Sequence, residues 1–248
     1  MKRIASILLV VLMMASLLLT GCGKKDAAEP AASENAAATP SAEANNTAAD
    51  DDFAYITDKG TLTIGITLYD PMNYYDDNGK LVGFDTEFAE AVCEELGIKP
   101  EFVEINWDTK EIELADKQID CIWNGLTITE ERKENMDFSD SYIKNMQVMV
   151  INKANADKFT DTASLADATV VAEVSSAGET AIAEDENLSK ATYVSVPKQT
   201  DALLEIKSGT ADAAVLDYTL AKSMVGEGTD CSDLMLVPDV ELAVEEYA

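Results

Sequence analysis

The sequence has no histidine and few basic residues: 18 lysines and arginines stand against 47 aspartates and glutamates among 248 residues. The formal charge of −29 excludes a nucleic-acid-binding protein, because phosphate backbones are bound by clusters of basic side chains. Without histidine, the side chain most used for proton transfer near neutral pH is missing, and so is a common zinc ligand. The four cysteines match no metal motif, so we expect neither a metal site nor a cofactor.

The sequence also lacks an apolar run long enough to span a membrane, which takes about 20 residues. The longest run, Ile4–Leu19, follows two basic residues and ends in Leu-Thr-Gly before Cys22. Such a pattern is typical of a cleavable signal peptide. The cysteine after it resembles a bacterial lipobox, so we expect residues 1–21 to be removed and a lipid to be attached to Cys22. An ordinary signal peptide with a chance cysteine is the alternative.

Residues 22–52 have the composition of a disordered tether. They contain eleven alanines and no aromatic or branched aliphatic residue, so they cannot bury enough apolar surface to offset the entropy of ordering. A lipid and a tether together predict an extracytoplasmic protein anchored to the cell membrane, on its outer face or in the periplasm. The remaining chain is globular in composition, because 47% of the whole sequence is apolar and 26% is charged.

From Phe53 onward, strand and helix patterns alternate in two successive β-α-β-α-β runs. Parallel strands need a helical crossover, so each run predicts a doubly wound α/β lobe, with lobe 1 at 53–148 and lobe 2 at 149–248. Ligands of such sheets bind beyond the carboxyl ends of the strands, which predicts a hinged cleft between the lobes. The expected strands are 62–68, 102–105, 119–123, 147–151, 169–174, 193–196, 213–216 and 234–237; the expected helices are one capped by Asp85 and ended by Gly97, then 112–117, 176–184, 200–207 and 219–225.

Three polar features are expected at strand ends in this cleft. Arg132 follows the strand of lobe 1 and offers a planar fork for a carboxylate, although it equally fits the charged face 130–134. Ser176 begins a helix whose free N–H groups favour an anion, and with Glu179 it also fits a capping box. Asp217 follows a strand of lobe 2, where it would meet an ammonium group or cap a helix. A guanidinium and an aspartate acting together suit a free α-amino acid.

Several motifs resemble, in the same order, those of the family 3 extracellular solute-binding proteins, the polar amino-acid receptors of ABC importers. They are Leu81–Asp85, Ile119-Asp120, Thr127–Arg132, Phe138–Tyr142 and Asp212–Asp217. The resemblance covers Thr61 to about Val237. It implies a periplasmic-binding-protein-like fold of type II and a non-enzymatic monomer that captures a free amino acid and delivers it to ABC permease subunits.

By matching position, the resemblance assigns Arg132 to the α-carboxylate of the ligand, with Thr127 beside it and Ser176 donating from lobe 2. It assigns Asp217 to the α-ammonium, together with the carbonyl group of Gly125. It also implies three further residues at the ligand, although core packing is the alternative for the two aromatic ones: Tyr69, Trp107 and Asn124.

The chain departs from the family pattern at three positions and at its end. Thr67 stands where receptors for cationic side chains often carry an acid, and Ser175 replaces a glycine. Glu173 replaces a residue that is often neutral, so it would meet a polar or cationic ligand side chain or point into solvent. The family normally continues through a second hinge strand back into lobe 1, followed by helices, so we expect that the C-terminal return segment is missing and that lobe 1 surface is left uncovered.

Other functions remain as alternatives. An enzyme on the same scaffold, such as a dehydratase, would use Glu173 as its catalytic carboxylate, and a lytic transglycosylase would need a further domain. A non-transport surface lipoprotein or adhesin would bind no small ligand, and a sensor input domain would need a spanning helix. For Cys93, Cys121 and Cys231 we expect buried thiols, with one disulfide at most.

Overall fold

A computed structural model describes residues 52–248 of the chain. The predicted signal peptide, the lipid site at Cys22 and the tether up to residue 51 lie outside the described residues. Asp52, which the composition assigned to the tether, begins the first helix, α1 (Asp52–Lys59). None of the described helices combines the length and the apolar character needed to cross a membrane.

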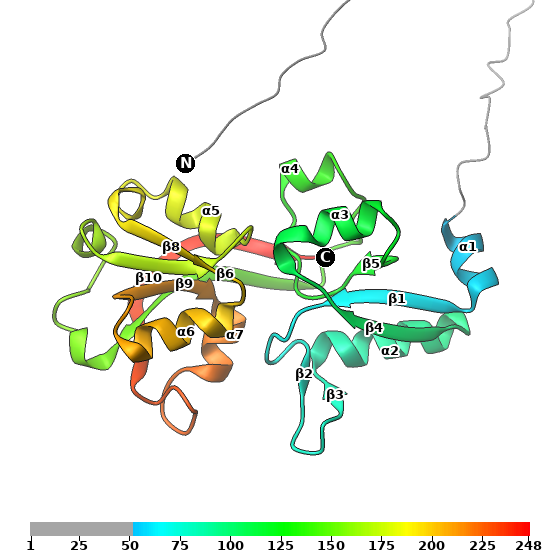
Figure 1. Cartoon of the computed structure of the whole chain (residues 1–248), viewed down its shortest axis with the longest axis horizontal. Helices are drawn as coiled ribbons and strands as arrows, with labels where there is room; N and C mark the ends of the chain where they lie inside the picture. Colours follow the sequence, from blue (N-terminus) through cyan, green and yellow to red (C-terminus); the bar gives the residue numbers. More distant parts are fainter. Residues whose placement is uncertain (1–51) are drawn as a thin grey trace, which may run out of the picture. The chain divides into compact units, whose positions relative to one another are not determined.

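Lobe 1 is built on a three-stranded parallel sheet in the order β4-β1-β5 (Figure 1). Buried residues on one face of this sheet, such as Ile64, pack with Ala89 and Cys93 on helix α2, and residues on the other face, such as Ile122, pack with Leu114 on α3. The elements are β1 (Thr61–Ile66), β2 (Tyr74–Tyr75), β3 (Leu81–Val82), α2 (Phe84–Leu96), β4 (Lys99–Glu104), η1 (Trp107–Thr109), α3 (Lys110–Ala115), β5 (Cys121–Ile122) and α4 (Glu130–Lys133).

The cap of α2 differs from the sequence prediction. The N-cap residue is Gly83, with a φ of 123°, and its place against the Met72 carbonyl leaves no room for a Cβ atom. Asp85 is instead buried and accepts a hydrogen bond of 2.8 Å from the backbone N–H of Gly125. Asp85 therefore fixes the turn after β5 rather than the start of its own helix. The predicted end of the helix at Gly97, in the left-handed conformation, is confirmed.

Lobe 2 is built on a five-stranded mixed sheet in the order β10-β6-β9-β7-β8 (Figure 1). Successive residues of β9 point to opposite faces: Leu216 packs with α6 and α7, and Val215 packs with α5. The elements are β6 (Ile143–Asn152), η2 (Lys153–Asn155), η3 (Ala163–Leu165), β7 (Thr169–Glu173), α5 (Ala177–Glu184), η4 (Leu188–Lys190), β8 (Thr192–Val196), α6 (Gln199–Ser208), β9 (Ala213–Asp217), α7 (Tyr218–Met224) and β10 (Leu234–Tyr247).

Two antiparallel strands, β6 and β10, connect lobe 2 with lobe 1. The strand pattern predicted a parallel sheet, but β6 pairs antiparallel with both β9 and β10. β10 extends ten residues past the predicted end at Val237, and the backbone N–H of Ile128 in lobe 1 donates to the Glu246 carbonyl at 2.9 Å. The lobe boundary predicted near 149 falls within β6, because this strand belongs to the second sheet from Ile143 onward.

Cys93 and Cys231 are buried, Cys121 is partly buried, and all three are free thiols, as expected. On lobe 1, apolar side chains line a groove that also contains Ala248, among them Leu114, Trp123 and Phe138.

Candidate ligand-binding cleft

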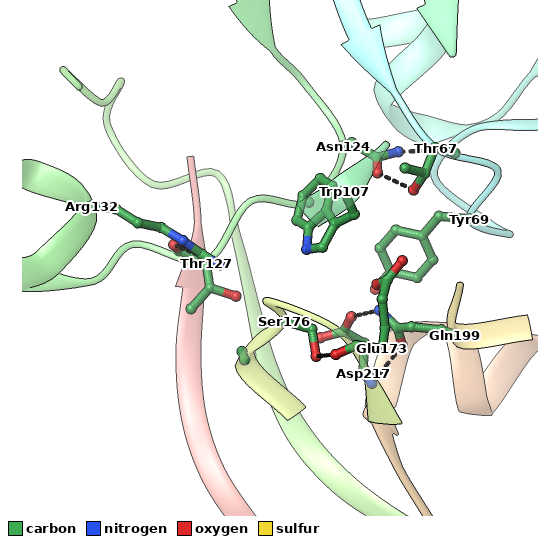
Figure 2. A pocket seen from close by; sticks show the side chains of 12 residues that line it. Thr67, Tyr69, Trp107, Asn124, Thr127, Arg132, Glu173, Ser176, Gln199 and Asp217 are labelled. Atoms are coloured by element: carbon green, nitrogen blue, oxygen red, sulfur yellow. Dashed lines mark hydrogen bonds between the residues drawn. The ribbon is translucent and has the colours of Figure 1, made fainter. Parts of the chain in front are cut away.

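One cavity between the two lobes brings together all nine residues that the sequence predicted for the site (Figure 2). Its volume is about 20 Å³, roughly the room that one water molecule needs. Ala177 and Gln199 also line it and were not predicted, and Thr67 was noted only as a departure from the family. The lining residues are Thr67, Tyr69, Trp107, Asn124, Gly125, Thr127, Arg132, Glu173, Ser176, Ala177, Gln199 and Asp217.

Arg132 lies in the cavity and not on a solvated helix face. The hydroxyl group of Thr129 caps α4 by accepting from the backbone N–H of Arg132 at 3.1 Å, and the Arg132 residue is only 8% exposed. Its Nη1 atom donates to the Thr127 carbonyl at 2.8 Å, and its Nη2 atom donates to the Ser175 carbonyl of lobe 2 at 3.3 Å. These two contacts hold the plane of the guanidinium group, and its Nε atom lies 3.9 Å from Glu111 Oε1. The second N–H groups of Nη1 and Nη2 remain to meet an anion.

Asp217 is the last residue of β9, and its side chain makes no capping hydrogen bond to α7. The carboxylate is 7% exposed and accepts at Oδ1 from Asn145 at 2.7 Å and from Gln147 at 2.6 Å. Gln199 donates to the second oxygen, Oδ2, and also accepts from the backbone N–H of Asp217 at 3.0 Å. The carboxylate is therefore held in one orientation by three amide side chains.

Glu245 on β10 is a second buried carboxyl group at this place, and the sequence reasoning missed it. Its Oε1 atom accepts from the same amide groups of Asn145 and Gln147 that bind Asp217, the latter at 2.9 Å. Burial raises the pKa of Glu245 to about 8, and the neighbouring charge of Asp217 adds to this effect. The shared donors therefore hold two carboxyl groups close together, and of these only Asp217 lines the cavity.

Glu173 is the last residue of β7 and lines the cavity beside Asp217 and Gln199 (Figure 2). Its side chain is buried, which raises its pKa to about 8; repulsion by Asp217 adds to the rise, and attraction by Lys110 opposes it. Unfolded glutamates titrate near pH 4.3, so the folded chain binds more protons than the unfolded chain between about pH 4 and 8. The unliganded fold therefore loses stability as the pH rises through this window.

The first residues of the loop after β7 contact lobe 1. Ser175 adopts a φ of 56°, the left-handed conformation that glycine takes easily. The turn is therefore formed even though serine stands at the position of the family's glycine. The Ser175 carbonyl accepts from Lys110 at 3.1 Å as well as from Arg132, and its hydroxyl donates to Asp108 at 2.7 Å. Ser176 caps α5 by accepting from the backbone N–H of Glu179 at 3.2 Å, which confirms the predicted cap.

Apart from Ala177 of α5, the remaining lining residues belong to lobe 1. The hydroxyl groups of Tyr69 and Tyr247 are 2.7 Å apart, and Gly125, with a φ of 59°, leaves space that both rings fill. Thr67 donates its hydroxyl to Asn124 Oδ1 at 2.7 Å, so these two side chains bind each other. Among residues 52–248, no group of acidic and cysteine side chains has the arrangement of a metal site.

Two α/β lobes that are joined by β6 and β10 and enclose a cavity with a buried arginine and buried carboxyl groups define a two-lobed solute-binding protein with the type II periplasmic-binding-protein fold. The chain belongs to the bacterial extracellular solute-binding proteins, family 3, whose model matches residues 62–224.

Known proteins with similar sequences and structures bind amino acids. The chain is 32% identical to the L-cystine-binding protein TcyA of Bacillus subtilis over 63% of its own length and 53% of that protein, so it spans about half of this relative. It is 33% identical to the arginine-bound form of truncated ArgBP from T. maritima, with a TM-score of 0.71, over 78% of this chain and 89% of that chain. The ancestral amino acid-binding protein AncCDT-1, a precursor of cyclohexadienyl dehydratase, matches with 33% identity and a TM-score of 0.71 over 79% of this chain and 83% of that chain.

Proposed function

We propose that this chain is the substrate-binding component of an ABC importer and captures a free α-amino acid between its two lobes. The observation that carries the proposal is the buried pair of opposite charges in one cavity, with Arg132 from lobe 1 and Asp217 from lobe 2. Arg132 binds the α-carboxylate through its planar fork, and Asp217 binds the α-ammonium. The amide groups around Asp217 keep its carboxylate oriented toward the cavity.

Capture works by a shift between open and closed forms of the two lobes. A ligand that touches both lobes binds the closed form more tightly than the open form, and this difference in affinity drives closure. The contacts of Ser175 with Lys110, Arg132 and Asp108 belong to the closed form, because they join lobe 2 to lobe 1. These polar contacts close the cleft around the ligand.

We further propose a lipid on Cys22, a tether over residues 22–51, attachment to the outer face of the cell membrane or location in the periplasm, and a monomer that meets permease subunits. The chain acts by binding rather than by catalysis, in line with relatives that are named as binding proteins. An amino acid recovered from the protein after long incubation is therefore expected to be chemically unchanged.

We expect one or a few of the twenty amino acids to raise the melting temperature of the protein. A ligand at 100 times its dissociation constant adds about 2.7 kcal/mol to the free energy of unfolding. For a chain of this size, that gain corresponds to a rise of roughly 5–10 °C in a thermal-shift assay. The matched controls are the analogues of the hit that lack the α-carboxylate or the α-ammonium, and both should give little or no shift. A surface lipoprotein without a small ligand predicts no shift with any amino acid, and that result would overturn the proposal.

A further inference from the structure

Building on the proposed amino-acid function, we propose that Glu173 is a specificity-determining residue that selects ligands whose side chain carries a positive charge. Three of the residues that line the cavity have basic or acidic side chains: Arg132, Asp217 and Glu173. The two charged groups that every α-amino acid carries neutralise the first two. Glu173 is then left over, and a neutral ligand leaves it without a partner in a closed cavity.

A buried charge without a partner is costly, so the remaining carboxylate matters for affinity. Glu173 is 4% exposed, and no basic side chain lies within 4.0 Å of it among the described residues. Taking such a group out of water is unfavourable unless an opposite charge or several hydrogen bonds replace the water. A cationic ligand side chain supplies the missing charge and makes the closed cavity neutral overall.

Lys110 of lobe 1 is the basic residue whose charge lowers the pKa of Glu173, but its ammonium group is hydrogen-bonded to other groups. Its ammonium group donates to the carbonyl groups of Trp107 and Ser175, both at 3.1 Å, and lies 4.8 Å from the centre of the Trp107 ring. The residue is 2% exposed, and burial lowers its pKa to about 8. Lys110 thus donates to main-chain oxygens and forms no ion pair with Glu173, and its charge offsets the raised pKa of Glu173 only in part.

The other groups that face Glu173 do not neutralise it either. Asp217 and Asp201 are acidic and raise its pKa, whereas Gln199 is an uncharged donor. Gln199 is itself bound to Asp217 through both ends of its amide group. The carboxyl group therefore keeps a raised pKa in the unliganded protein, and a cation placed beside it lowers that pKa and releases a proton.

The position of Glu173 suits contact with a ligand side chain. β7 lies between β8 and β9 in the sheet, so Glu173 and Asp217 end neighbouring parallel strands at one edge. In Figure 2, Glu173 lies near Asp217 and Tyr69, on the side of the cavity away from Arg132. Tyr69 and Trp107 add aromatic surface for the methylene groups or for the cation itself. Receptors for cationic side chains often carry an acid at the position of Thr67 in lobe 1. Here Thr67 is hydrogen-bonded to Asn124, so the carboxyl group for a cationic side chain is that of Glu173 in lobe 2.

The test compares two cations with their neutral isosteres by calorimetry: L-arginine with L-citrulline, and L-lysine with L-norleucine. The members of each pair share the α-amino and α-carboxyl groups and differ in side-chain charge. We expect the wild-type protein to bind the cation at least tenfold more tightly in at least one pair. The proposal is overturned if an amino acid binds but neither pair shows this preference. Failure of every amino acid to bind would instead overturn the proposed function.

Substitution of Glu173 provides the second arm of the experiment. Glu173→Gln keeps the shape and removes the charge, so the preference for the cation should fall to threefold or less while the neutral isostere binds about as before. Glu186→Gln, an exposed change of the same kind in lobe 2, should keep the preference. A preference that survives in Glu173→Gln would contradict the proposal.

Proton release gives a readout that a merely structural role of Glu173 would not alter. Calorimetry at pH 7 in buffers of different ionisation enthalpy should detect more protons released by the cation than by its isostere. Both ligands carry the same α-ammonium, so effects on Asp217 and Glu245 cancel in the comparison. The difference should be absent in Glu173→Gln, and equal proton release from both ligands by the wild-type protein would contradict the proposal.

Discussion

Replacing Arg132 with alanine is expected to weaken amino-acid binding by roughly 30- to 5,000-fold. The guanidinium group is buried in the cavity and fixed by the carbonyl groups of Thr127 and Ser175. Its removal leaves the ligand carboxylate buried without a partner, and truncating one member of such a charge pair costs about 2–5 kcal/mol. Arg132→Lys should recover only part of the loss, because lysine keeps the charge but not the bidentate fork.

The control for this result lies one residue further along α4. Lys133 is exposed and pairs with Glu130 at 2.7 Å, so Lys133→Ala removes a positive charge from the same helix without changing the cavity. Its affinity should stay within a factor of two of the wild-type value, as measured by calorimetry. The melting temperature of each unliganded variant checks that the fold is intact. A folded Arg132→Ala variant with unchanged affinity would remove Arg132 from the site.

The second large effect is expected for Asp217→Asn, which should also weaken binding by about 2–5 kcal/mol. Asparagine keeps the size of the side chain but removes the negative charge that pairs with the α-ammonium. The carboxylate is already held by Asn145, Gln147 and Gln199 in the wild-type protein. Little conformational entropy of this side chain is therefore lost when a ligand binds. The exposed residue Asp230 in lobe 2 offers a matched control, and Asp230→Asn should bind normally.

The ligand itself provides a sharper check on Asp217. An analogue without the α-ammonium gains nothing from the aspartate, so it should bind the wild-type protein and Asp217→Asn with similar, weak affinity. The affinities of both ligands for both proteins form a thermodynamic cycle. This cycle separates the interaction between the ammonium and the carboxylate from general effects of the substitution. If the analogue lost as much affinity as the natural ligand on substitution of Asp217, the assigned contact would be wrong.

Local patterns predicted the residues that stand at the ends of parallel strands. Asp217 follows a strand whose apolar residues are visible in the sequence, and Ser176 begins a helix within a capping box. Glu173, which ends β7, was noted only as a departure from the family pattern. The carboxyl ends of parallel strands meet at one edge of the sheet. The order of strands and helices in the sequence therefore already predicts that these positions lie close together. The choice of Arg132 as a ligand contact depended on the family resemblance, since its spacing also fitted a solvated helix face.

The residues that were missed depend on pairings between distant strands. Asn145 and Gln147 reach Asp217 because β6 runs antiparallel to β9, with Gln147 opposite Asp217. Glu245 joins them because β10 continues to Tyr247 and pairs with β6. The register of two strands separated by about a hundred residues is set by the packed fold, and a shift of one residue would turn these amide groups to the other face. No local spacing in the sequence encodes such an arrangement.

Asp85 illustrates a related error. An acidic residue at the start of an amphipathic run is typical of a helix cap, but the chain enters α2 through Gly83, and the carboxyl group turns inward to Gly125. Burial raises the pKa of Asp85 to about 6, a cost that a capping residue on the surface would not carry. Here a tertiary contact with the turn after β5 replaces the local hydrogen bond that the pattern indicated.

A crystal structure of the protein with its amino acid would test most directly whether Arg132 and Asp217 bind the two charged groups of the ligand. We predict α-carboxylate oxygens within hydrogen-bonding distance of the Arg132 guanidinium, and the α-ammonium at the same distance from the Asp217 carboxylate. A ligand lying in this cavity without contact to either side chain would contradict the account, as would a ligand bound at a different place on the two lobes.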